Sequence, residues 1–360
     1  MHTYCIIIFM LSAHHKDHNT KSIKARLMKW LGLTNEVTIK PYHGYGHADQ
    51  MTVYGHVFRL SPLPRKKYRK SFLRNTLALL RLFMVRPYIN AEIEMQWGEQ
   101  VFKTSSDKDG FFKIEWKDTL PHSLGWHEAF FSVRKNGKII STSGGKIFIP
   151  HPTQYGFISD IDDTFLISHS SNLRKRLFVL FTENARSRKP FEGVVKHYQL
   201  LALSNTSAQT PNPFFFVSSS EWNLYDYILE FTRVNKIPQG VFLLNQLKVF
   251  SELLKTGQNH HMTKFTRIAR ILEKYPKQRF ILLGDSSQQD PYIYESIVSH
   301  FPKRIHAVYI RDVYARNKEK AVDVLGKIES KGVPCCFFQH SADAILHSQK
   351  IGLLPETELV

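Results

Sequence analysis

The sequence has little cysteine, few acidic residues for its length and no long apolar run. There are 3 cysteines in 360 residues, and two of them, Cys335 and Cys336, are adjacent and therefore poorly placed to bridge each other. A disulfide framework and a Cys-x-x-Cys metal site are excluded, and a reducing compartment is favoured. No run reaches the roughly 20 apolar residues that a membrane-spanning helix needs.

The apolar start of the chain, YCIIIFMLSA over residues 4–13, is too short for a membrane span. It resembles the core of a signal peptide, but no Lys or Arg precedes it. We therefore expect a cytoplasmic protein, peripheral at a membrane if it binds one, and secretion is the less favoured alternative.

The shortage of acidic residues leaves a strong positive charge. Lys and Arg number 49 against 31 Asp and Glu, which gives a net charge of +18 and a pI near 9.7. Such a chain is expected to meet polyanions, either an anionic membrane surface or nucleic acid. No recognised nucleic-acid motif supports the second partner, so we expect the first.

Basic residues concentrate at 64–87, PRKKYRKSFLRNTLALLRLFMVRP, where apolar residues recur at helical spacing. Two interpretations stay open. The segment is an amphipathic helix that docks on anionic lipid, or it caps the neighbouring β domain and keeps its charges solvated.

The hydrophobic pattern divides the chain. Residues 1–35 form an extension with an amphipathic helix at Lys21–Leu33, and 36–150 alternate with a period of two between frequent turn signals, which predicts a β-sandwich domain with 64–87 inserted. From 151 to 348 strands and helices alternate, which predicts an α/β domain with a parallel sheet. Residues 349–360 form a tail.

One stretch of the α/β part, QYGFISDIDDTFL at 154–166, ends a predicted strand in Asp160 and Asp162, with Thr164 behind them. Residues two apart on an extended segment point the same way, so two carboxylates share one place at the carboxyl edge of the sheet. A hard cation such as Mg²⁺ would relieve their repulsion. The alternative is an Asp-rich turn that closes a strand.

Three later features decide between these readings. The apolar strand FFFV at 214–217 ends in Ser218, Ser219 and Ser220, which suit a phosphate oxygen but also suit a helix N-cap. Lys264 lies near a helix start and can stabilise phosphoryl charge, with Lys248 as a weaker rival. A third strand ends in Gly284 and Asp285, and Asp290 follows after a short loop, so both acids can reach one metal ion.

This order of motifs resembles the haloacid dehalogenase superfamily of phosphotransferases. Within it, the segments DIDDT, NARSRKPFEGV, VSSSEWNLYD, GDSSQQDPYIY and AVYIRDV are similar to the actin-patch-type phosphatidate phosphatases, which are related to the lipins. The resemblance covers about Tyr155–Val313. Ser287 and Glu221 depart from the family pattern without touching a proposed catalytic group.

The resemblance implies a Rossmannoid domain that hydrolyses phosphatidate to diacylglycerol. It assigns Asp160 as the nucleophile and Asp162 as the general acid and base. Ser218 and Lys264, with Thr164 and Ser219 beside them, would bind the phosphate. The metal, Mg²⁺, would be held by Asp160, the main chain of Asp162, and the side chains of Asp285 and Asp290.

Two further hypotheses stay open. The substrate is another phosphomonoester, such as a phosphoprotein or a lysolipid phosphate, or the protein is a lipid-binding module without turnover. Only about fifty residues separate Thr164 from Phe214. That is small for a covering lid, and an open site suits a substrate whose bulk stays outside.

Overall fold

The computed structural model describes residues 28, 32–47, 49–63, 77–78, 80–118, 123–151, 155–165, 189–247, 260–287 and 289–356, without the side chains of 260–263. The predictions for the N-terminal extension, for most of the basic segment 64–87 and for Lys248 lie outside these residues. Among the described helices, none combines the length and the apolar character needed to cross a bilayer.

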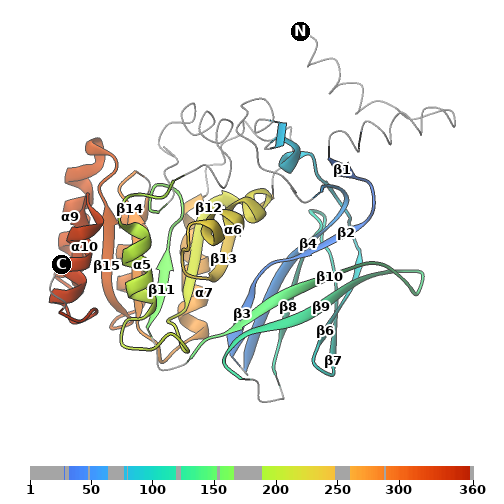
Figure 1. Cartoon of the computed structure of the whole chain (residues 1–360), viewed down its shortest axis with the longest axis horizontal. Helices are drawn as coiled ribbons and strands as arrows, with labels where there is room; N and C mark the ends of the chain where they lie inside the picture. The colour runs from blue at the N-terminus through green and yellow to red at the C-terminus, as the bar shows by residue number, and fades with distance from the viewer. Residues whose placement is uncertain are drawn as a thin grey trace, which may run out of the picture.

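The first part of the described chain is a mixed β-sheet (Figure 1). Its strands are β1 Leu33–Thr34, β2 Thr38–Pro41, β3 Gly44–His47, β4 Gln50–Pro62, β5 Arg86–Pro87, β6 Glu92–Trp97, β7 Gln100–Ser105, β8 Phe111–Trp116, β9 Gly125–Lys135 and β10 Lys138–Ile149, with a short 3-10 helix at Arg81–Phe83. The order β1-β4-β3-β10-β9-β6-β7 gives one path through the sheet, and β2, β5 and β8 also pair with β4.

This sheet folds over on itself around an apolar core. Alternate residues of β4 face that core with residues of β6, β8, β9 and β10, among them Val53, Ile93, Phe112 and Phe131. The predicted β region is therefore present as one mixed sheet. Strand β3 joins its two halves, because it pairs antiparallel with β4 and parallel with β10.

The second part is a six-stranded sheet in which every pair is parallel, in the order β13-β12-β11-β14-β15-β16. Its strands are β11 Gly156–Ser159, β12 Phe214–Glu221, β13 Gly240–Asn245, β14 Phe280–Asp285, β15 Ile305–Arg311 and β16 Cys335–Phe338. The chain moves outward from β11 to β13 and then returns to β14 on the other side of β11. The carboxyl ends of β11 and β14 therefore meet where strand order reverses, the usual ligand position in open α/β sheets.

Helices cover both faces of this sheet (Figure 1). They are α5 Val194–Ala202, α6 Tyr225–Val234, α7 His260–Lys274, α8 Asp290–His300, α9 Lys318–Glu329 and α10 Ser341–Lys350. α7 contacts α8 and α8 contacts α9, whereas α5 contacts α10. The predicted fold class, a β-rich region followed by a Rossmannoid α/β domain, is confirmed. Leu353 and Leu354, in the stretch assigned to a tail, are buried in the α/β core.

The two parts pack into one unit through an aromatic interface. The rings of Tyr42 and Trp222 stack with their centroids 4.0 Å apart. The side chain of His43 lies 2.9 Å from the carbonyl oxygen of Gly240, and Lys40 pairs with Asp226 at 2.7 Å. Because Tyr42 also belongs to the core of the α/β domain, the β part covers the β12–β13 side of the parallel sheet.

Candidate active site

Strand β11 delivers the first aspartate to the carboxyl edge of the parallel sheet. All four residues of β11 are buried between β12 and β14, so the strand is fixed on both sides. The N–H of Asp160 continues the pairing by donating to the carbonyl of Leu283 at 2.8 Å. Asp163 then adopts a left-handed conformation, with φ of 58°, which turns the chain away from the sheet. Asp160 and Asp162 are thereby held at the edge.

Three buried carboxylates meet there. Oxygens of Asp160, Asp285 and Asp290 all lie within 4.8 Å of one another, and each residue is at most 1% exposed. Asp285 ends β14, the strand beside β11, and Asp290 begins α8. Gly284 permits this approach, because a Cβ at that position would lie 2.5 Å from Oδ2 of Asp290.

Lys264 neutralises part of this negative charge. Its ammonium group lies 3.0 Å from Oδ1 of Asp160 and also pairs with Asp290. The side chain is 2% exposed. Burial alone lowers the pKa of this ammonium, but the two carboxylates raise it above its ordinary value, so the charge is retained.

Burial destabilises the ionised forms of two of these carboxylates, those of Asp160 and Asp285, and so raises their pKa values. Burial raises the pKa of Asp160 to about 7, against the opposing effect of Lys264 and with the help of Asp290 and Asp162. Burial, followed by the charges of Asp290 and Asp160, also raises the pKa of Asp285 well above its usual range. A divalent cation would stabilise the ionised forms.

The residues present fit such a cation. Three carboxylates supply the hard oxygen ligands that Mg²⁺ takes in proteins. Oδ2 of Asp160 is buried and meets no hydrogen-bond donor among the described residues, which leaves it available to a metal. The carboxylate cluster can thus bind a metal ion, and the identity of that ion belongs to the proposal below.

Two serines hold the second aspartate of the motif. The hydroxyls of Ser218 and Ser220 donate to Oδ2 of Asp162 at 3.3 and 2.5 Å. The sequence places three serines at this strand end, but the predicted phosphate site includes only Ser218 and Ser219, and not Ser220. Alternation along β12 is the signal that favours Ser220, since residues 218 and 220 share a face. Ser219 lies on the other face and is partly exposed.

Thr164 and two buried arginines frame the site. The hydroxyl of Thr164 donates to Asp285 at 3.4 Å. Arg311, at the end of β15, donates to the carbonyl of Thr164 at 3.0 Å. Arg267, one turn after Lys264 on α7, donates to the carbonyls of Ser218 and Leu243, both at 3.0 Å. Each guanidinium therefore fixes the main chain at a predicted site residue, Thr164 in the loop after β11 and Ser218 within β12.

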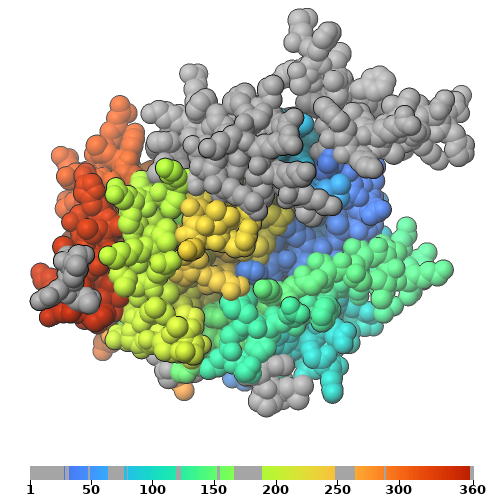
Figure 2. Space-filling model, in the orientation of Figure 1, coloured from blue at the N-terminus to red at the C-terminus, as the bar shows by residue number. Residues whose placement is uncertain are grey.

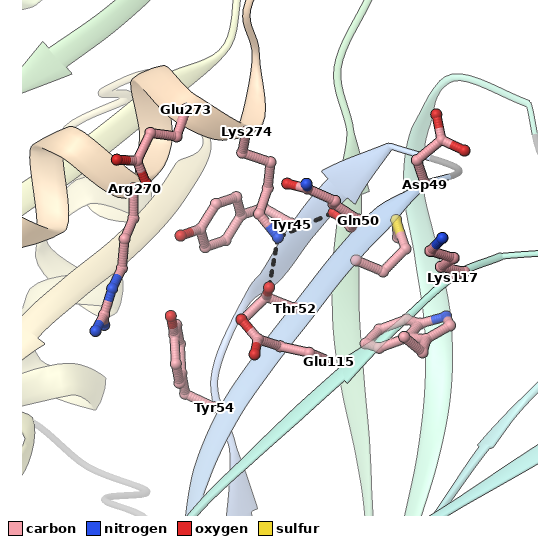
Figure 3. A pocket seen from close by; sticks show the side chains of 12 residues that line it. Tyr45, Asp49, Gln50, Thr52, Tyr54, Glu115, Lys117, Arg270, Glu273 and Lys274 are labelled. Atoms are coloured by element: carbon pink, nitrogen blue, oxygen red, sulfur yellow. Dashed lines mark hydrogen bonds between the residues drawn. The ribbon is translucent and has the colours of Figure 1, made fainter.

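Two pockets lie between the β part and α7. One, of about 650 Å³, adjoins the carboxyl edge, where Arg267, Trp222 and Leu244 line it together with Phe111 of β8. The other, of about 480 Å³, surrounds Lys274, whose ammonium points toward Thr52 and Gln50 (Figure 3). Ten helical residues, about 15 Å, separate Lys264 from Lys274, so the second pocket is remote from the aspartates.

A parallel sheet with paired aspartates after its first strand and an acidic pair after the neighbouring strand defines a haloacid-dehalogenase-like domain. Residues 155–312 match the family described as "Phosphatidate phosphatase APP1, catalytic domain".

The chain is similar to two yeast proteins over part of their length. It is 31% identical over 193 residues to "Phosphatidate phosphatase APP1" of Saccharomyces cerevisiae, covering 51% of this chain and 31% of that protein. An uncharacterized Schizosaccharomyces pombe protein is 21% identical over 218 residues, or 59% of this chain and 34% of that protein. The chain thus spans about a third of each relative.

Solved structures are only distantly similar over the whole chain. A carbohydrate acetylesterase from Xanthomonas citri aligns with a TM-score of 0.27 at 11% identity, covering 74% of this chain and 66% of that one. A β-glucuronidase from Ruminococcus gnavus gives a TM-score of 0.27 at 9% identity, covering 85% and 54%.

Proposed function

We propose that this protein is a Mg²⁺-dependent phosphatidate phosphatase, which hydrolyses phosphatidate to diacylglycerol and inorganic phosphate. The observation that carries the proposal is the buried cluster of Asp160, Asp285 and Asp290 with Lys264, inside a domain that matches the APP1 catalytic family. Its place of action is the cytoplasmic face of an anionic membrane, consistent with the net charge of +18.

The metal would be held by Asp160, Asp285 and Asp290, with the main chain of Asp162. When bound, Mg²⁺ reduces the repulsion between an anionic nucleophile and an anionic phosphate ester. The ammonium of Lys264 and the hydroxyls of Thr164 and Ser218 would bind phosphoryl oxygens, because phosphoryl transfer depends chiefly on alignment and charge neutralisation. The hydroxyl of Ser219, on the other face of β12, is not expected to take part.

The reaction would proceed in two steps. A carboxylate oxygen of Asp160 forms a bond to phosphorus while the bond to the glycerol oxygen breaks, and Asp162 gives its proton to that oxygen. Water then bonds to phosphorus while the bond to Asp160 breaks, and Asp162 takes the proton of the water. Both aspartates return to their initial state.

The first prediction tests this mechanism. Asp160→Asn keeps the size of the side chain but removes the nucleophile, so phosphate release should fall at least about a thousandfold. We expect wild-type activity on phosphatidate vesicles to vanish with a chelator and to return with Mg²⁺. Asp163→Asn is the matched control, because Asn tolerates the left-handed conformation of that residue.

Substrate range separates the alternatives. If the protein hydrolyses phosphopeptides or soluble phosphomonoesters but does not hydrolyse phosphatidate in vesicles, its substrate is another phosphomonoester. Vesicle binding without release from any ester would favour a lipid-binding module. Equal activity of wild type and Asp160→Asn would refute the mechanism.

A further inference from the structure

Exposed apolar side chains gather on the outer face of strands β7, β6, β9 and β10. Val101, Phe130 and Ile139 are 56%, 59% and 53% exposed and line one hollow of about 650 Å³, and Ile140 follows at 37%. The register supports this grouping, because Gln96 of β6 pairs with Val101 on one side and with Phe130 on the other. Single exposed apolar residues are ordinary, whereas a group marks an interaction surface.

Positive charge surrounds these side chains. Arg134, Lys135 and Lys138 lie at the β9–β10 end, and Lys103 lies on β7. They are opposed by Glu94, which contacts Lys103 at 3.2 Å and Arg134 at 2.5 Å. Glu92, exposed on the same side of β6 and paired in register with Arg134, adds a second carboxylate. Four cations against these two carboxylates leave a cationic surplus. We call the eight residues Val101, Lys103, Phe130, Arg134, Lys135, Lys138, Ile139 and Ile140 the hairpin face.

The β9–β10 hairpin projects from the body of the protein, on the side away from the α/β domain (Figures 1 and 2). Its two-residue turn has φ of 51° at Asn136 and 75° at Gly137, the left-handed pair that closes a tight hairpin without splaying its strands. All residues from 135 to 140 are exposed. The tip therefore exposes both sides of the hairpin, the Arg134–Ile139 pair on one and the Lys135–Lys138 pair on the other.

We propose that the hairpin face docks on an anionic lipid bilayer, with Ile139 and Ile140 entering the headgroup boundary and the cations meeting lipid phosphates. Apolar side chains beside Lys and Arg are the combination that binds such an interface. A second copy of this chain would bring the same surplus of positive charge, and like charges disfavour that pairing. The inference rests on the proposed function in one respect, since a phosphatidate phosphatase must reach its substrate in a membrane.

The test measures binding without turnover. The full-length chain, with a chelator present, is sedimented with phosphatidylcholine vesicles that contain or lack phosphatidate. Ile139→Ser with Ile140→Ser should weaken binding to the anionic vesicles about tenfold. Lys135→Gln with Lys138→Gln should weaken it by a similar factor and reduce its dependence on salt.

Matched controls come from the opposite side of the molecule. Val322 on α9 and Leu346 on α10 are 47% and 48% exposed, and Val322→Ser with Leu346→Ser should leave vesicle binding unchanged. Lys318→Gln with Lys320→Gln on α9 is the charge control. Circular dichroism and thermal unfolding show whether each variant is folded.

Equal binding by the hairpin variants and the wild type would overturn the proposal, as would equal losses in the controls. A wild type that self-associates and hairpin variants that are monomeric would also overturn it, by assigning the face to a second copy. Vesicle binding that depends on the hairpin while no ester is hydrolysed would support this inference and refute the proposed function. Hydrolysis of phosphatidate without hairpin-dependent binding would support the proposed function and refute this inference.

Discussion

At the scale of single residues, the site depends on a close approach that one glycine permits. Gly284 sits between the buried part of β14 and Asp285, and its φ needs no left-handed conformation. What it lacks is a side chain. A Cβ would lie 2.5 Å from Oδ2 and 2.9 Å from Cβ of Asp290, and also 2.9 Å from the ring of Tyr294. The glycine therefore sets the distance between α8 and the aspartates.

Gly284→Ala is expected to keep the fold and lose activity. The methyl group displaces Asp290 from Lys264 and Asp160, and a displacement of about 1 Å can lower turnover roughly a hundredfold. Overpacking should also cost about 1–3 kcal/mol of unfolding free energy. Phosphate release and urea unfolding measure the two effects.

The control is Gly326→Ala in α9, where a Cβ meets nothing within 4 Å. It should raise the unfolding free energy by about 0.5–1 kcal/mol, because Ala is the better helix former, and leave phosphate release unchanged. Full activity in Gly284→Ala would show that the position of Asp290 is not critical.

At the scale of elements, the two ends of β15 carry similar arginine clamps with different neighbours. Arg304, just before the strand, donates to the carbonyls of Gln278, Leu272 and Tyr275 at 2.6–3.1 Å. Arg311, its last residue, donates to the carbonyls of Thr164 and Gln339 and to the hydroxyl of Ser341 at 2.9–3.0 Å. Only the second clamp holds a loop of the candidate site.

This pair allows a prediction with an internal control. Lys cannot reproduce a planar three-way contact, so Arg304→Lys and Arg311→Lys should each cost about 1–3 kcal/mol of unfolding free energy. Phosphate release per folded molecule should fall about tenfold or more only in Arg311→Lys, because only there does the loop of Thr164 lose its anchor. Equal activity losses in the two variants would show that the clamp acts through general stability.

Much of this architecture follows from local pattern. The alternation of buried strands with helices after residue 152 identifies the parallel sheet, and the acids at two strand ends identify the cluster, because parallel strands bring their carboxyl ends together. Two adjacent glycines favour a turn, but Gly144 and Gly145 lie inside β10. Gly145 is needed there because a Cβ would meet the ring of Phe131 at 2.7 Å. Such long-range crowding leaves no local signal.

The clamps and the position of Lys264 are also beyond a local pattern. Arg304, Arg311 and Arg267 look like surface cations in the sequence, and burial against carbonyls from other elements is what defines their role. Lys264 could be proposed from its place near a helix start, but only the family resemblance, through the order of the motifs, favoured it over Lys248.

At the scale of the whole molecule, the β part and the α/β domain share a buried interface that contains neutral histidines. Burial lowers the pKa of His43 to about 4, and that of His56 to about 3. The ring of His43 lies against the carbonyl of Gly240 across the interface, and that of His56 lies 2.9 Å from the hydroxyl of Tyr42. Both rings must gain a proton when acid unfolds the protein.

The sign of their effect follows from linkage. Unfolded histidine has a pKa near 6.5, so between about pH 6.5 and pH 4 the unfolded chain binds more protons than the folded one at His43. The contribution of His43 to the free energy of unfolding is therefore complete above this pH range. It decreases as the pH falls through the range, by at most about 1.4 kcal/mol per pH unit. Asp160 and Asp285, whose pKa values burial raises, titrate with the opposite sign.

Because the histidines and the aspartates change the unfolding free energy in opposite directions, the effect of His43 has to be measured as a difference between a variant and the wild type. We predict that His43→Gln, which keeps a hydrogen-bonding side chain but cannot titrate, is less sensitive to acid than the wild type. The difference between their unfolding free energies, from urea titrations at successive pH values, should change in favour of the variant from pH 6.5 to pH 4 and be constant from pH 7 to pH 8. A constant difference for His43→Gln from pH 6.5 to pH 4 would mean that the interface opens to admit the proton before the chain unfolds, and the two parts would then separate in acid as independent units.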